Sequence, residues 1–149
     1  MIGYSFGFSW KGLLAFLLIM IPNIFYFFLP NSAVSGSADS NHLIGDIIEH
    51  VSQAIFIILL MFLVNKRGSP MVSPYTVCMA ILLLSYYVLW TFYFTGSKNL
   101  VILLGMAVLP VAYFVLAEIW LHNLPAIIPT AIFGFVHIII TYIDFQNSH

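Results

Sequence analysis

The stretch that decides the fold is LIGDIIEHVSQAIFIILLMFLV, residues 43–64. It is long enough to cross a bilayer, because a hydrocarbon core about 30 Å thick needs about 20 helical residues. Its polar side chains fall at i, i+3, i+4 and i+7, which places Asp46, Glu49, His50 and Gln53 on one helical face. The stretch therefore predicts a membrane-spanning helix, and we expect its polar face to contact protein because polar groups are costly in lipid.

Four further apolar runs of similar length occupy most of the remaining chain: Gly12–Leu29, Tyr75–Thr95, Leu100–Leu121 and Leu124–Phe145. Hydrophobic residues make up 62% of the 149-residue chain, charged residues only 6%, and the mean hydropathy is +1.08. Soluble domains carry about 25% charged residues, so a water-soluble globule would leave much apolar surface uncovered. We predict an all-α integral membrane protein, a compact bundle of five transmembrane helices with short loops that forms a single domain over residues 1–149.

Basic residues in short loops indicate the orientation, because Lys and Arg are enriched on the cytoplasmic side. Placing the N-terminus in the cytoplasm puts Lys11, Lys66 and Arg67 inside and Lys98 outside. The C-terminus is then outside. We expect the first run to be retained, because it exceeds the apolar core of about 7 to 15 residues that a cleaved signal peptide carries. The near absence of long loops favours a bacterial inner membrane.

The connections predict an up-and-down arrangement. They are short, so helices adjacent in sequence are expected to pack as antiparallel neighbours. The longest connection, residues 30–42, is rich in Ser, Ala and Asn and is expected to be coil, with Asn41 capping the next helix. Pro22 and Pro110 fall inside two predicted helices, where each removes a backbone hydrogen bond and is expected to kink its helix.

Two other runs carry stripes at helical spacing. In the fifth run, polar or small residues recur at steps of four, three, four and three from Thr130 to Asp144, with His137 near mid-membrane. In the third run an aromatic face extends from Tyr86 to Tyr93. In the predicted orientation these groups and the polar face of residues 43–64 share the outer half of the membrane. We therefore predict a polar, ligand-binding cavity there, lined by Asn23, Asp46, Glu49, His50, Gln53, Tyr86, Trp90, Tyr93, His137, Thr141 and Asp144.

Such stripes have a second interpretation, because polar side chains also join membrane helices through hydrogen bonds that serve only packing. Sequence alone leaves both interpretations open. Histidine and carboxylate groups deep in a membrane are an expensive way to join helices. Glu49 and His137 are therefore the sharpest hypothesis for a functional pair, brought together across the cavity by kinked or tilted helices.

The inner end of the predicted bundle holds a smaller polar pair. Glu118 and His122 lie one turn apart on the fourth run. In the predicted orientation they are near the cytoplasmic interface and within reach of Lys66 or Arg67. We interpret them as an interfacial ion-pair anchor, with a proton-exit role as the alternative.

Sharper chemical motifs are missing. The chain contains no H-E-x-x-H, no G-x-S-x-G, no P-loop and only one cysteine, Cys78. Glu49 and His50 are adjacent and point about 100° apart on a helix, so we expect no metal and no cofactor. The net charge of −1 provides no basic surface for nucleic acid.

Three classes of function remain open. The first is a protein that binds or transports a small amphiphilic or protonatable ligand through the outer cavity. The second is an accessory or immunity-type subunit that acts through helix contacts with a partner protein. The third is an intramembrane enzyme that uses Glu49 or Asp46 with His50 or His137 as acid and base on a lipid-like substrate. The expected partners are membrane lipids, an amphiphilic ligand, and either a second copy of the chain or another membrane protein.

Overall fold

The computed structural model describes residues 3–28 and 43–148, which are 80% helical. Each of its five helices is long and apolar enough to cross a membrane. The predicted helix bounds agree with the structure to within two residues at every described end; the predicted coil at 30–42 and the Asn41 cap lie outside the described residues. The elements in chain order are β1 (Tyr4–Phe6), α1 (Trp10–Phe28), α2 (Leu43–Phe62), β2 (Leu63–Asn65), α3 (Pro74–Phe94), α4 (Leu100–Trp120) and α5 (Leu124–Asn147).

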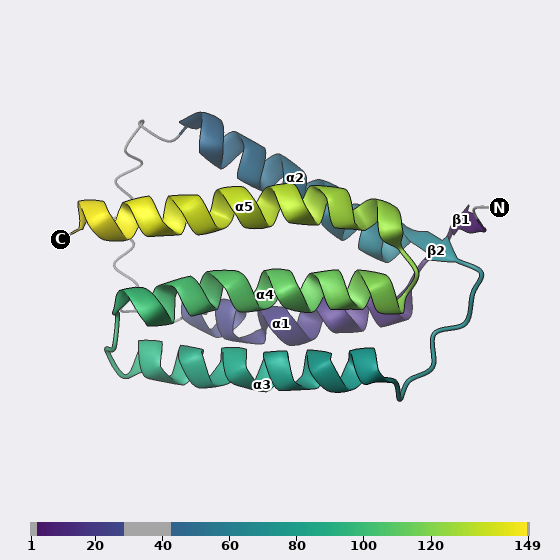
Figure 1. Cartoon of the computed structure of the whole chain (residues 1–149), viewed down its shortest axis with the longest axis horizontal. Helices are drawn as coiled ribbons and strands as arrows, with labels where there is room; N and C mark the ends of the chain where they lie inside the picture. The colour runs from purple at the N-terminus through teal and green to yellow at the C-terminus, as the bar shows by residue number, and fades with distance from the viewer. Residues whose placement is uncertain (1–2, 29–42, 149) are drawn as a thin grey trace.

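The helices alternate in direction along the long axis of the molecule (Figure 1). Helices α1, α3 and α5 start at the end that holds β1 and β2, called here the ribbon end. Helices α2 and α4 run the opposite way, from the end where α5 finishes, called here the C-terminal end. The two chain termini therefore lie at opposite ends of the bundle, as an odd number of crossings requires.

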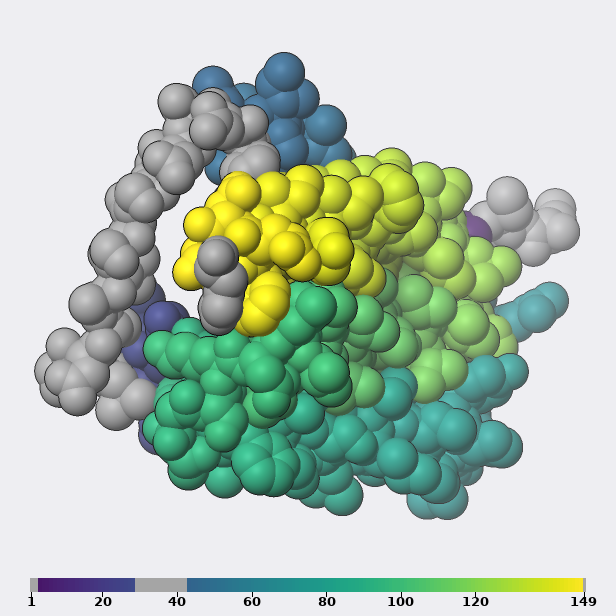
Figure 2. Space-filling view, turned by 60° about the vertical axis from the view of Figure 1, so that its left-hand side comes forward, coloured from purple at the N-terminus to yellow at the C-terminus, as the bar shows by residue number. Residues whose placement is uncertain are grey.

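The packing order differs from the order in sequence. Helices α5, α4 and α3 lie side by side, shown in yellow, green and teal in Figure 2, while α2 packs along α5. The expectation that sequence neighbours pack together is wrong for α2 and α3, which lie on opposite sides of the described bundle (Figure 1). The reason is that the polar face of α2 meets the polar stripe of α5, where Glu49 contacts His137.

The described fold is not purely helical, which corrects the all-α prediction. Strand β1 pairs antiparallel with β2, in a register that places Ser5 opposite Val64, a residue predicted to be helical. The N–H groups of Gly7 and Ser9 also donate to the carbonyls of Phe62 and Met61, at 2.9 and 2.7 Å. The last carbonyls of a helix have no partner within the helix. The N-terminal segment thus satisfies the end of α2.

Helix α1 makes close backbone contacts with the bundle in its ribbon-end half. A Cβ added at Gly12 would lie 2.4 Å from the carbonyl oxygen of Leu60, so α1 and α2 are in backbone contact there. The Tyr113 hydroxyl donates to the Ala15 carbonyl at 2.8 Å, and the Tyr87 hydroxyl donates to the Leu18 carbonyl. Toward the C-terminal end, α1 lines a cavity. The close contacts at the ribbon end therefore hold in place the helix that forms part of the cavity wall.

Most of the helical surface faces outward and is apolar. Between 17% and 28% of the residues in each span are buried within the chain. Large side chains such as Phe25, Leu84 and Phe135 are more than 60% exposed. Water would be a poor solvent for this surface, because burying apolar area is the main force that stabilises a soluble fold. The five helices therefore support an integral membrane location.

Candidate functional site

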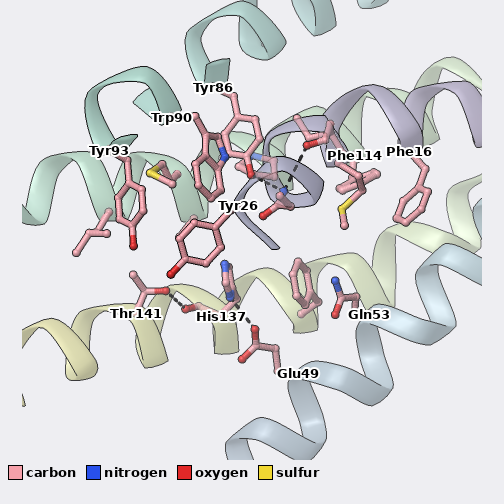
Figure 3. A pocket seen from close by; sticks show the side chains of 18 of the residues that line it. Phe16, Tyr26, Glu49, Gln53, Tyr86, Trp90, Tyr93, Phe114, His137 and Thr141 are labelled. Carbon is pink, nitrogen blue, oxygen red and sulfur yellow. Dashed lines mark hydrogen bonds and ion pairs between the residues drawn. The ribbon is translucent and has the colours of Figure 1, made fainter. Parts of the chain in front are cut away.

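A cavity of about 330 Å³ lies inside the half of the bundle toward the C-terminal end, and all five helices line it. This volume is at the lower end of the range of about 300 to 1,000 Å³ for small-molecule pockets. Figure 3 shows Tyr86 and Trp90 on one side of this central cavity and Glu49 and His137 on the other. Nine of the side chains that line it carry a polar atom: Asn23, Tyr26, Glu49, Gln53, Tyr86, Trp90, Tyr93, His137 and Thr141.

The remaining lining is apolar and includes four phenylalanines. Phe56 lies between Phe114 and Phe133, with ring centroids 5.0 and 5.3 Å away, and Phe16 extends this cluster to α1. Aromatic pairs at such distances add to the stability that burial alone provides. They also give the cavity a rigid apolar wall, completed by Ile19, Met20, Leu103, Met106, Ala107 and Pro110.

Glu49 and His137 form the charged centre of the cavity. The Nδ1 atom of His137 and Oε1 of Glu49 are 2.7 Å apart, so the predicted proximity of the two side chains is confirmed. The Glu49 side chain is 15% exposed and that of His137 is 34% exposed. The Phe133 ring stacks on the imidazole with a centroid distance of 5.2 Å, and Thr141 donates to the His137 carbonyl. The Glu49 contact and the Phe133 stacking orient the imidazole, whereas the Thr141 hydrogen bond is made to the backbone.

An aromatic group faces this pair from across the cavity. Rings of Tyr26, Trp90 and Tyr93 lie 5.4 to 5.9 Å apart, and Tyr86 contacts Trp90 at 6.3 Å. Asn23 donates to the Tyr86 hydroxyl at 3.0 Å. The indole N–H of Trp90 is buried beside the Tyr86 hydroxyl and makes no well-aligned hydrogen bond within the described chain. A buried donor without a partner is costly, so the cavity presents an unused hydrogen-bond donor.

Eight of the eleven predicted site residues line the central cavity, and three do not: Asp46, His50 and Asp144. His50 is exposed, and its Nδ1 lies 2.6 Å from the Asp46 carbonyl of its own helix. The physical reason is the width of the predicted stripe. At about 100° per residue, Glu49 and Gln53 form the edge nearest the cavity, while Asp46 and His50 form the other edge.

Tyr26 is a lining residue that the sequence pattern did not single out. It lies three residues after Asn23, so both side chains share one face of α1. That spacing was a usable signal, because Asn23 is among the residues predicted to line the cavity. A tyrosine near the end of a span is also typical of the interfacial aromatic belt, so the position of Tyr26 does not by itself distinguish a lining residue from a belt residue.

Glu118 does not form the predicted interfacial anchor. Its side chain is fully buried and accepts a hydrogen bond from the Thr130 hydroxyl on α5. His122, in contrast, lines a pocket at the ribbon end together with Lys66 and Arg67. Proximity in sequence to a helix end suggested exposure, but α5 covers this face of α4. The second oxygen of Glu118 has no partner within the described residues.

Asn123, the residue between α4 and α5, was also not anticipated. Its amide donates to the carbonyls of Leu59 and Leu63, at 2.7 and 3.1 Å, and is 1% exposed. It thereby joins the turn between α4 and α5 to the end of α2.

Within residues 3–28 and 43–148, no group of three or more His, Cys, Asp or Glu side chains is arranged to hold a metal ion. The chain matches no protein-family model, no curated protein and no solved structure.

Proposed function

We propose that this protein binds or transports a small amphiphilic ligand with a protonated amine head, in the central cavity of a membrane-embedded bundle. The observation that carries the proposal is the Glu49–His137 pair at 2.7 Å in the wall of a cavity rich in aromatic side chains. A carboxylate attracts an ammonium group, and electron-rich rings such as Trp90 and Tyr93 stabilise a cation over their faces. The apolar wall around Phe56 accommodates the hydrocarbon part.

The proposed orientation places the N-terminus in the cytoplasm and the C-terminus outside, in a bacterial inner membrane. Support comes from the ribbon end, which gathers Lys11, Lys66 and Arg67, whereas Lys98 lies at the other end. The central cavity then occupies the outer half of the membrane. The ligand enters from the outer side or sideways from the outer leaflet.

Probes that share one tail and differ in the head test this proposal. Octylamine, octanol and octanoate are titrated by calorimetry into the purified protein in detergent. The expected order of affinity is octylamine, then octanol, then octanoate, because a carboxylate in the cavity attracts an ammonium and repels a carboxylate. Glu49→Gln should abolish the preference for octylamine over octanol, whereas Asp46→Asn, one turn away and outside the cavity lining, should keep it. Equal affinity for the three probes in the parent protein refutes the proposal.

A second candidate function is supported by the same pair. A carboxylate in hydrogen-bond contact with an imidazole is also the arrangement of an acid–base pair, and 2.7 Å lies within the range of about 2.6 to 3.2 Å that proton transfer needs. The distinguishing result is turnover. If the protein is an enzyme, it converts a lipid-like substrate and the His137→Gln variant does not. If it is a binding protein, it releases its ligand unchanged.

A further inference from the structure

A second pocket, of about 470 Å³, lies at the ribbon end and is assembled from four separate parts of the chain. Tyr4 of β1 and Tyr75 of α3 contribute to its lining, and Lys66 and Arg67 follow β2. His122 comes from the turn between α4 and α5. This basic pocket is at the opposite end of the bundle from the central cavity, so a ligand here is independent of the proposed function.

The charge of the basic pocket is one-sided. Lys66 and Arg67 are exposed, and no carboxylate lines the pocket. Within the described residues neither side chain forms a salt bridge. Glu118, in the last turn of α4, is fully buried and does not line the pocket. Two cationic groups therefore share a concave site without a counter-charge.

The backbone of the basic pocket is held in place by specific hydrogen bonds. The Lys66 N–H donates to the Gly3 carbonyl at 3.0 Å, which continues the pairing of β1 with β2. The Asn65 side chain donates to the His122 carbonyl at 3.0 Å and accepts from the Arg67 N–H at 2.9 Å. The segment that carries both cations is thus tied to β1 and to the turn after α4, so the site is preformed.

The position of the basic pocket is that of a membrane interface. Tyr75 lies in the first turn of α3, Ile119 in the last turn of α4 and Leu124 at the start of α5. The Trp120 indole, at the same level, donates to the Pro70 carbonyl at 2.8 Å. Tyr and Trp concentrate where hydrocarbon meets headgroups. The pocket therefore offers apolar side chains on its membrane side next to cationic groups at headgroup depth.

We propose that the basic pocket binds the phosphate of an anionic phospholipid. The Arg67 guanidinium suits phosphate because its planar N–H groups donate in pairs, while Lys66 supplies a second charge. The Tyr4 and Tyr75 hydroxyls offer further donors, and the acyl chains run along Leu124 and Ile119. Basic pockets between helices on the cytoplasmic side are a known type of site for anionic headgroups.

Native mass spectrometry of the whole protein tests this proposal. The protein is released from micelles that contain phosphatidylglycerol and phosphatidylcholine with identical acyl chains at equal mole fractions. The expected result is one phosphatidylglycerol retained in preference to phosphatidylcholine. Lys66→Gln and Arg67→Gln should each reduce that preference about fivefold, since each basic residue near an anionic surface contributes about 1 kcal/mol. Lys98→Gln removes the same charge at the C-terminal end and should leave the preference unchanged.

Two results overturn the assignment. If the Lys66→Gln/Arg67→Gln double variant keeps the parent's preference while remaining folded, the basic pocket is not the lipid site. If millimolar inorganic phosphate displaces phosphatidylglycerol completely, the pocket recognises free phosphate and not a lipid. Persistence of lipid binding in phosphate, together with its loss in the double variant, supports a phospholipid site.

Discussion

Glu49 and His137 are 88 positions apart in the sequence and 2.7 Å apart in the fold. Their contact joins α2 to α5, two helices that are not consecutive, and it places the charged centre of the central cavity at the crossing of their polar stripes. The same contact explains the packing order of the bundle. A carboxylate in a bilayer needs a partner. Helix α5 supplies His137, whereas the polar side chains of α3 near mid-span are only Tyr, Trp, Ser and Thr.

Removing either partner of this pair should destabilise the protein more than an ordinary membrane hydrogen bond does. We expect a coupling free energy of about 1.5 to 3 kcal/mol from a double-mutant cycle with Glu49→Gln and His137→Gln, the range of hydrogen bonds that involve a charged group. Purely packing hydrogen bonds in membranes average about 0.6 kcal/mol. Reversible unfolding in mixed micelles gives the free energies. A coupling at or below the packing value would make the pair structural.

Trp90 and Tyr86 should respond differently to loss of their polar atoms. Trp90→Phe removes an N–H that makes no well-aligned hydrogen bond within the described chain, so the free energy of unfolding should change little apart from lost packing area. Tyr86→Phe removes the hydrogen bond from Asn23 and should cost about 1 kcal/mol. For octylamine affinity we expect the larger loss from Trp90→Phe. Equal effects of both variants on affinity would show that the indole N–H does not face the ligand.

Much of this arrangement follows from sequence patterns that have a physical cause. The spans are predictable because the thickness of a bilayer fixes the length of an apolar helix. The encounter of Glu49 with His137 is predictable because both lie on polar stripes at similar depth. Burial of Glu118 is not, because it depends on Thr130 lying across from it on α5, a relation that no spacing within α4 reveals.

The two-stranded ribbon could not be predicted from the sequence, for a different reason. Strands of three residues, such as Tyr4–Phe6 and Leu63–Asn65, are too short to show an alternating pattern. They form because the carbonyls of Met61 and Phe62, at the end of α2, need donors and the chain before α1 provides them. That need is visible only once the end of α2 is known.

Cysteine labelling should place residue 37 and Gly68 on opposite sides of the membrane. In a Cys78→Ser background, Ser37→Cys should react with a membrane-impermeant maleimide added to intact cells. Gly68→Cys should react only after the membrane is opened, because three of the four basic residues lie at its end of the bundle. A Cβ at Gly68 meets no atom within 4 Å, so the substitution itself is harmless. The reverse labelling pattern would invert the proposed orientation.

Glycine substitutions should show that the close approach of α1 to α2 is rigid. A Cβ at Gly12 would lie 2.4 Å from the backbone oxygen of Leu60, whereas a Cβ at Gly105 would lie 2.6 Å from Cδ1 of Leu89, the mobile end of a side chain. Overpacking costs about 1 to 3 kcal/mol, and alanine regains about 1 kcal/mol over glycine in a helix. Gly12→Ala should therefore lower the free energy of unfolding, while Gly105→Ala should stay within about 1 kcal/mol of the parent.

The same pair of variants tests whether the α1–α2 contact shapes the central cavity. The atom that a Cβ at Gly12 would meet is a backbone oxygen of α2, which cannot move without its helix, so Gly12→Ala should displace α1. Helix α1 bears Asn23 and Tyr26, which line the cavity. We expect octylamine affinity to fall in Gly12→Ala and to persist in Gly105→Ala, measured by calorimetry at a temperature where both variants are folded. Gly68→Ala serves as the neutral control. If Gly12→Ala destabilises the protein but binds octylamine as the parent does, the contact supports the fold without setting the position of the cavity wall.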